Sequence, residues 1–190
     1  MSYEYSPEEE ALLAQNLSVL IEQIHRSVFR SRLLDTSLLC DFHRAIFQGV
    51  RSHAGRHRRR EQGSEHLIFF GRRAVHRDRV ADELTEVFSR TKESLRSLDE
   101  NQESPEYEAL ALRVAAWTHA RVIEIQPFED GNKRTSRALM THILVRAGLP
   151  PIPLEATRQE YNDAFVYFLE KRDIQPMTDL LLKLYRENLA

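Results

Sequence analysis

Cysteine is almost absent from this 190-residue chain, which contains Cys40 and no other, so an internal disulfide is excluded. Cys40 stands beside Leu39 and near Phe42, a setting typical of a small buried hydrophobic residue and not of a nucleophile. No apolar run approaches the roughly 18 residues of a membrane-spanning helix, and the first residues lack the basic and apolar regions of a signal peptide. We therefore expect a cytoplasmic protein with no membrane partner, although this argument would miss a translocated effector.

A strong charge of either sign is also missing. The 27 Lys and Arg residues nearly balance the 29 Asp and Glu residues, and the net charge of -2 gives no reason to expect nucleic acid as the main partner. Glycine is scarce, with 6 residues, 42% of the residues are hydrophobic, and no repeat or low-complexity segment is present. These features predict one compact domain over residues 1–190.

Helical periodicity dominates the pattern of apolar residues. The predicted helices cover residues 7–29, 36–50, 78–98, 104–124, 132–147, 155–172 and 177–188. Ser6, Pro7 and Glu9 predict the start of the first of them, as an N-cap, a first helical residue and the partner in a capping box. The one persuasive strand is 65–71, a short apolar run between glycines. The sequence therefore predicts a mainly α, helical-bundle fold with a short β-hairpin.

The helix over 104–124 leads into the most informative stretch. Pro105 suits its first helical position. One face carries a stripe at helical spacing: Leu110, Val114, Trp117 and Arg121. Gln126 precedes Pro127, whose ring disfavours the right-handed α region for its neighbour, so we expect Gln126 to be extended and to end the helix.

The loop 126–131 then feeds the start of the 132–147 helix, where backbone N–H groups without internal partners form an anion site. Gly131 would let a phosphate approach the backbone. The first two turns add three cationic side chains: Lys133, Arg134 and Arg137. Cations there oppose the helix dipole unless an anion is bound nearby, so the pattern indicates a phosphate site. The alternative is an ordinary solvated basic turn.

Asp130 stands beside this proposed phosphate site. A carboxylate in that position can share a divalent cation, Mg²⁺, with phosphate oxygens. The glycine spacing and the Gly-Lys pair of a Walker loop are missing, so a P-loop ATPase is rejected.

Residues 126–137, QPFEDGNKRTSR, resemble the signature of the Fic/Doc family, His-x-Phe-x-(Asp/Glu)-(Gly/Ala)-Asn-(Gly/Lys)-Arg-x-x-Arg. The matching positions are Phe128, Asp130, Gly131, Asn132, Arg134 and Arg137. A second match, 42–47 with Gly55 and Arg58, is similar to the segment before the family's flap. The resemblance covers roughly residues 39–182. It implies a Fic-type helical bundle that uses ATP and Mg²⁺ to transfer AMP to a protein hydroxyl.

By this resemblance, the catalytic positions are Gln126, Phe128 and Asn132, and Asp130 holds the metal. The nucleotide would be bound by Gly131, Asn132, Lys133, Arg134, Arg137 and Tyr161. The flap residues Leu67, Ile68, Phe69 and Phe70 would hold an extended segment of the target protein by β-augmentation.

Gln126 stands where the family has its catalytic histidine. Histidine there would act as the general base that takes the proton from the target hydroxyl. A carboxamide has no accessible basic lone pair near neutral pH, so we expect transfer to be impaired while nucleotide binding remains. His119 lies seven residues earlier, ~10 Å along the helix axis, too far to replace it.

Two further functions remain open. Lys133 is the variant that resembles the Doc branch, whose members transfer a phosphate, so a Doc-like protein kinase is one alternative. A catalytically inactive nucleotide- or protein-binding scaffold is the other, favoured by Gln126. The family's inhibitory motif, (Ser/Thr)-x-x-x-Glu-(Gly/Asn), is missing from both terminal helices. Either a separate antitoxin-like inhibitor restrains the protein, as in a toxin-antitoxin pair, or an impaired site needs no restraint.

Overall fold

The computed structural model describes residues 4–58, 68–150 and 156–189 and confirms the predicted all-α class. Its helices are α1 (Pro7–His25), α2 (Thr36–Phe47), α3 (Val80–Asp99), α4 (Tyr107–Ile125), α5 (Asn132–Arg146), α6 (Arg158–Lys171) and α7 (Gln175–Leu189). A 3-10 turn, η2 (Arg77–Arg79), precedes α3, and the short strands β1 (Ile68–Phe69) and β2 (Arg72–Arg73) pair antiparallel.

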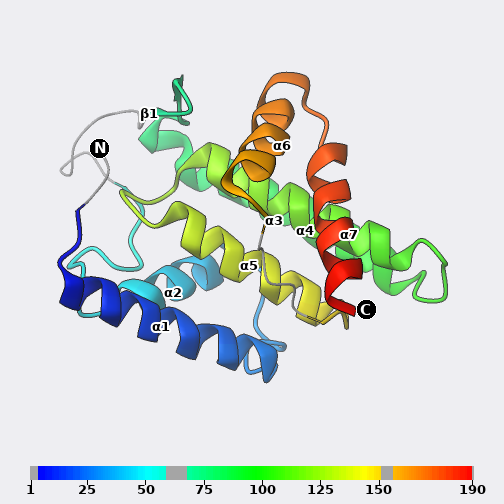
Figure 1. Cartoon of the computed structure of the whole chain (residues 1–190), viewed down its shortest axis with the longest axis horizontal. Helices are drawn as coiled ribbons and strands as arrows, with labels where there is room; N and C mark the ends of the chain where they lie inside the picture. The colour runs from blue at the N-terminus through cyan, green and yellow to red at the C-terminus, as the bar shows by residue number, and fades with distance from the viewer. Residues whose placement is uncertain (1–3, 59–67, 151–155, 190) are drawn as a thin grey trace.

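Helix α4 lies at the centre of the bundle and packs against α3, α5 and α7 (Figure 1). Its buried face includes four alanines, Ala111, Ala115, Ala116 and Ala120, all of them fully buried. Interaxial distance depends on the side chains at the contact, so small residues allow the neighbouring helices to approach closely. The core is thus built around a helix whose buried face combines these alanines with larger residues such as Leu112 and Ile123.

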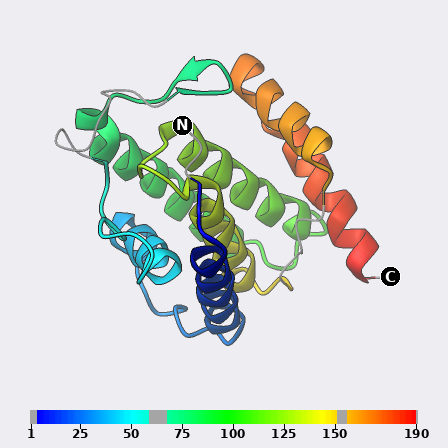
Figure 2. The same cartoon turned by 60° about the vertical axis from the view of Figure 1, so that its left-hand side comes forward.

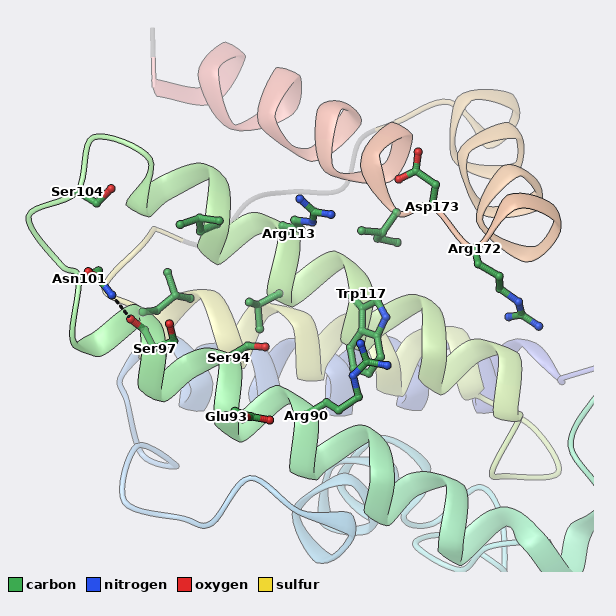
Figure 3. Close-up of a pocket in the computed structure, with 14 residues that line it drawn as sticks. Arg90, Glu93, Ser94, Ser97, Asn101, Ser104, Arg113, Trp117, Arg172 and Asp173 are labelled. Carbon is green, nitrogen blue, oxygen red and sulfur yellow. Dashed lines mark hydrogen bonds between the residues drawn. The ribbon is translucent and has the colours of Figure 1, made fainter.

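The predicted stripe of α4 lies on one face of the helix, but that face is not part of the buried core. Leu110 is 38% exposed, and Val114 and Trp117 are only partly buried, because this face lines a surface groove of about 880 Å³ between α3, α4 and the α6–α7 connection (Figure 3). In the groove the Arg90 guanidinium lies over the Trp117 ring, 4.8 Å from its centroid. Leu110, Val114 and Trp117 thus face this groove, whereas the core face of α4 carries the alanines together with Leu112, Val122, Ile123 and Ile125.

Two helix boundaries also differ from expectation. Pro105 does not begin α4, which starts at Tyr107 after a turn. Helix α1 begins as predicted, with a Ser6 capping box to Glu9, but it ends at His25. Beyond it the backbone reverses at a positive φ, and Val28, which the predicted helix 7–29 would include, is 56% exposed.

The β1–β2 hairpin reaches across to α6 (Figure 2). Its turn residues Phe70 and Gly71 both have positive φ, as tight two-residue hairpin turns require. The rings of Phe69 and Phe70 lie 6.3 and 5.5 Å from that of Phe165 on α6. The strand prediction is confirmed at residues 68–69, and residues 65–67 lie outside the described residues.

None of the described helices combines the length and hydropathy that crossing a bilayer requires. Cys40 is partly buried, with Sγ 3.3 Å from Nε2 of His57, and burial raises the pKa of its thiol to about 11. The thiol is therefore protonated near neutral pH and is not a nucleophile.

Three of the histidines that the structure describes are buried: His43, His119 and His142. Burial lowers the pKa of each from 6.5 to about 4. The unfolded chain therefore binds more protons than the folded protein below pH 6.5. Their contribution to the free energy of unfolding is complete above pH 6.5 and is lost as the pH falls towards 4, with a slope of up to about 1.4 kcal/mol per pH unit for each histidine.

We predict that His142→Phe makes the free energy of unfolding less dependent on pH between 6.5 and 4, as measured by urea denaturation at a series of pH values. Phenylalanine keeps an aromatic ring against Phe42, whose centroid lies 5.7 Å from that of His142, and removes the titrating group. The control is His25→Gln, which removes an exposed histidine of α1 in place of a buried one. Equal slopes for His142→Phe and the parent chain would contradict the prediction.

Candidate active site

Helix α4 ends in a left-handed residue. Gln126 has φ 52° and ψ 61°, and its N–H donates to the carbonyl of Val122. The expectation of an extended Gln126 is wrong, because Pro127 excludes the right-handed α region for its neighbour but leaves the left-handed region, which also terminates a helix. The chain therefore turns sharply into the loop 126–131.

Asn132 closes this loop from the first position of α5. Its Oδ1 accepts from the N–H of Phe128 at 2.9 Å, and its Nδ2 donates to the carbonyl of Phe128 at 2.9 Å. The same Nδ2 lies 3.0 Å from Oε1 of Gln126. The buried Asn132 amide thus binds both the backbone of the loop and the side chain at its entrance.

The Gln126 amide is engaged at both ends. Its Nε2 donates to the carbonyl of Ile123 at 2.6 Å, and its Oε1 accepts from Asn132. The side chain lines the cavity described below, but its hydrogen bonds serve the helix end and the loop.

The start of α5 has the features of an anion site. Gly131 is its N-cap and offers no capping side chain, and the first turn holds no acidic residue. The first N–H groups of a helix lack intrahelical acceptors, so they remain available to a ligand. The predicted anion site therefore has free donors at its centre.

The three cations in the first two turns of α5 lie against aromatic rings. The Lys133 ammonium is 5.3 Å from the Phe70 ring, the Arg137 guanidinium is 5.3 Å from the Tyr161 ring, and the Arg134 guanidinium is 5.2 Å from the Tyr5 ring. Within the described part of the chain, none of the three forms a salt bridge with an acidic side chain. Their charges are therefore available to a bound anion.

Gly131 is required for packing. It has φ +75°, and a Cβ atom there would lie 2.1 Å from Cε2 of Phe47. The approach of a phosphate was the only reason for glycine that could be inferred from the sequence, because the contact with Phe47 depends on the position of α2.

Asp130 has one satisfied and one unsatisfied oxygen. Its Oδ1 accepts from the N–H of Gly131 at 2.6 Å, whereas its Oδ2 is buried without a hydrogen-bond partner in the described residues. Burial raises the pKa of this carboxyl. Such an orphaned oxygen fits a cation. The described residues contain no group of three His, Cys, Asp or Glu side chains able to hold a metal, so further ligands would come from phosphate and water, as is usual for Mg²⁺.

His43 is a structural residue of the site that the sequence did not single out. Its Nδ1 accepts from the N–H of Gly55 at 2.8 Å, so the proton is on Nε2, which donates to the carbonyl of Asp130 at 3.1 Å. Its ring stacks between Phe47 and Phe128, with centroid distances of 4.6 and 3.9 Å. In the sequence, the only sign of a role for His43 is its position within residues 42–47, which are similar to the segment before the family's flap.

The loop and the hairpin enclose a cavity of about 550 Å³. Among the predicted site residues, those that line it are Ile68, Phe69, Phe70, Gln126, Asp130, Gly131, Asn132, Lys133 and Arg134, joined by Ile123 and Glu129. Phe128 is not in this lining, because its ring packs against His43 in the core. Leu67 lies outside the described residues.

Arg137 and Tyr161 lie outside this lining, next to one another. Tyr161 is buried on α6, and its hydroxyl oxygen is 2.7 Å from Nε2 of His119. His119 therefore faces α6 and does not reach the cavity at the position of Gln126.

Comparison with known proteins decides the family. The family model described as Fic/DOC family matches residues 33–144. This chain belongs to the Fic/DOC family. Its members among solved structures share the fold: a Fic domain-containing signalling protein from Bacteroides thetaiotaomicron has a TM-score of 0.74 and 19% identity, with 97% of this chain and 72% of that chain covered.

Two more relatives are informative. The BepC protein of Bartonella tribocorum, a VirB-translocated effector solved with bound AMPPNP, has a TM-score of 0.66 and 17% identity, with 90% of this chain and 85% of that chain covered. The protein adenylyltransferase Fic of Culex quinquefasciatus is 42% identical over 66 residues. Those residues are 34% of this chain and 13% of that protein, so the Fic/DOC chain matches about an eighth of its curated relative.

We predict that Gly131→Ala destabilises the protein by ~2–4 kcal/mol, because it adds a clash with Phe47 to the cost of a left-handed alanine. Gly148→Ala is the matched control. Its φ is +76°, but no atom lies within 4 Å of the added Cβ, so only the backbone cost of about 1–2 kcal/mol applies. Urea denaturation measures both, and equal losses would show that Phe47 does not restrict residue 131.

Proposed function

We propose that this Fic/DOC chain is a protein adenylyltransferase whose transfer step is impaired by Gln126. The observation that carries the proposal is the α5 start, where an uncapped helix N-terminus, three cations without acidic partners and the orphaned Asp130 oxygen lie together. The curated relatives that match the chain are named protein adenylyltransferases. Neighbours of the same fold were solved with AMPPNP and with ADP.

In this proposal, ATP places its phosphates on the first N–H groups of α5. Lys133, Arg134 and Arg137 neutralise the charge that builds on the phosphates during transfer. Asp130 holds Mg²⁺ through its free oxygen, and bound Mg²⁺ would supply charge neutralisation on the phosphate oxygens.

The nucleotide base is assigned to α6. Tyr161 lies beneath the Arg137 guanidinium, and next to it Asn162 has a buried Oδ1 without a hydrogen-bond partner in the described residues. A buried acceptor without a donor is costly, and the amino group of adenine can satisfy it. This supports ATP as the substrate nucleotide.

A protein target is assigned to the hairpin. Ile68 is 65% exposed and Phe70 38%, so apolar side chains stand on a two-stranded sheet beside the cavity. An extended target segment can add to the edge of such a sheet and cover these side chains, which brings its hydroxyl group towards the loop 126–131.

The transfer itself would form a bond from the target hydroxyl oxygen to the α-phosphorus and break the bond to the leaving pyrophosphate. The hydroxyl proton must leave as well. Gln126 cannot accept it, and both ends of its amide are already engaged with Ile123 and Asn132. The site therefore retains its positioning and electrostatic groups but lacks a general base.

Two alternative functions remain, and one residue favours each of them. Lys133, whose ammonium lies between the rings of Phe70 and Tyr161, favours a Doc-like kinase that transfers the γ-phosphate. Gln126 favours a nucleotide- or protein-binding scaffold without chemistry. A separate antitoxin-like inhibitor would be expected to pair with the exposed Arg137, which has no acidic partner among the described residues.

We predict that Gln126→His increases label transfer from α-labelled ATP with Mg²⁺ into proteins of a cell lysate by ~10²–10⁴, the usual contribution of a general base. Gln126→His combined with Arg137→Ala is the control and should lose most of this transfer. Equal labelling by the parent chain would show that another residue acts as base. Label from γ-labelled ATP alone would support the kinase, and nucleotide binding without transfer would support the scaffold.

We also predict that Asp130→Asn removes the Mg²⁺-dependent part of ATP binding, because the neutral amide no longer attracts the cation. Isothermal titration calorimetry with and without Mg²⁺ measures this directly. Glu129→Gln is the matched control, since Glu129 is an acidic residue that lines the same cavity one position earlier. Equal losses in both variants would mean that general negative charge, and not a metal site at Asp130, promotes binding.

A further inference from the structure

Arg58 is a buried arginine that binds the loop of the candidate site through its backbone. Its side chain is almost completely enclosed, at 2% exposure. The guanidinium donates to the carbonyl of Gln126 at 2.6 Å and to that of Ile125 at 3.1 Å, and the Arg58 N–H donates to the carbonyl of Pro127 at 3.0 Å. One residue therefore binds three successive carbonyls at the end of α4.

These carbonyls need such a partner. The last carbonyls of a helix have no intrahelical donor and lie at the negative end of its dipole, where a cation is favourable. Gln126 also adopts a left-handed conformation, which is costly for a residue other than glycine. Arg58 compensates for both, because its planar group can donate to several carbonyls at once.

The same guanidinium also reaches the other side of the cavity. It donates to the carbonyl of Val75, which follows strand β2 (Arg72–Arg73). Arg58 precedes the hairpin in the sequence, and Val75 follows it. The contacts of Arg58 therefore connect the segments on both sides of the hairpin to residues 125–127. None of these contacts of Arg58 involves α5, where the proposed phosphate site lies.

We infer that Arg58 is a positioning residue that sets the spacing between the β1–β2 hairpin and residue 126. The inference deepens the proposed function, on which it rests for its catalytic meaning: the residue determines where a target segment on the hairpin lies relative to the loop. Loss of these donors therefore loosens the hairpin more than it disturbs the start of α5.

The test substitution is Arg58→Lys, which keeps the positive charge but has a point-like ammonium that cannot span carbonyls on both sides. Hydrogen exchange of the amides at 68–75 is expected to accelerate at least ~10-fold, while exchange in the buried part of α5 changes less than ~3-fold. The affinity for ATP with Mg²⁺ should be unchanged. In the Gln126→His background, label transfer into lysate proteins should fall ~10-fold or more.

Arg56→Lys is the matched control. Arg56 lies two residues earlier and is exposed, and among the described residues its side chain donates to the carbonyl of Ser52 alone, at 2.5 Å. It should leave hairpin exchange and transfer unaltered. Unchanged exchange at 68–75 in Arg58→Lys, or equal acceleration in Arg56→Lys, would overturn the inference.

A third variant keeps the test decisive if Arg58→Lys does not fold. Gln126→Gly adopts the left-handed conformation without strain, so Arg58→Lys in that background should fold and still show fast exchange at 68–75. Slow exchange there would overturn the inference. Failure of the proposed function gives a different result: no form transfers label, whereas the exchange data still show whether Arg58 holds the hairpin.

Discussion

The left-handed turn at Gln126 is the constraint on which the site depends. Because the chain reverses there, the carbonyls at the end of α4 point to Arg58 on one side, while the Gln126 side chain meets Asn132 on the other. The loop that follows can then be short enough for Asn132 to bind both backbone groups of Phe128. An extended Gln126 would separate these partners and displace the start of α5.

The second support of the site is an aromatic stack from α2. His43 lies between Phe47 and Phe128 and donates to the carbonyl of Asp130. Helix α2, which is far from the loop in the sequence, therefore fixes the position of the loop 126–131. Phe47 leaves no room for a side chain at residue 131. The Asp130 carboxylate is therefore held with Oδ2 buried and without a hydrogen-bond partner in the described residues. A bound cation would offset the free-energy cost of burying this oxygen.

Much of the site was accessible from the sequence because its residues are contiguous. The 126–137 segment contains the metal candidate, the helix start and the cations, so a motif and a helix boundary were enough to place them together. Arg58 and His43 could not be assigned roles in this way, because their contacts depend on the packing of α2 and the hairpin against the loop. The same limit applies to the stripe on α4: periodicity located the face with Leu110, Val114 and Trp117, but only packing shows that this face lines a surface groove and that the opposite face is buried.

The substitution at Gln126 is consistent with a site whose architecture is kept without its base. The Gln126 side chain does not simply point into solvent. Its amide donates to the carbonyl of Ile123 and accepts from Asn132. The glutamine thus stabilises the loop that positions the anion site. In the proposed function, nucleotide binding depends on the helix start and its cations, and transfer depends on removal of the hydroxyl proton. Gln126 supports the loop and cannot remove that proton, so the proposal separates binding from chemistry within one loop.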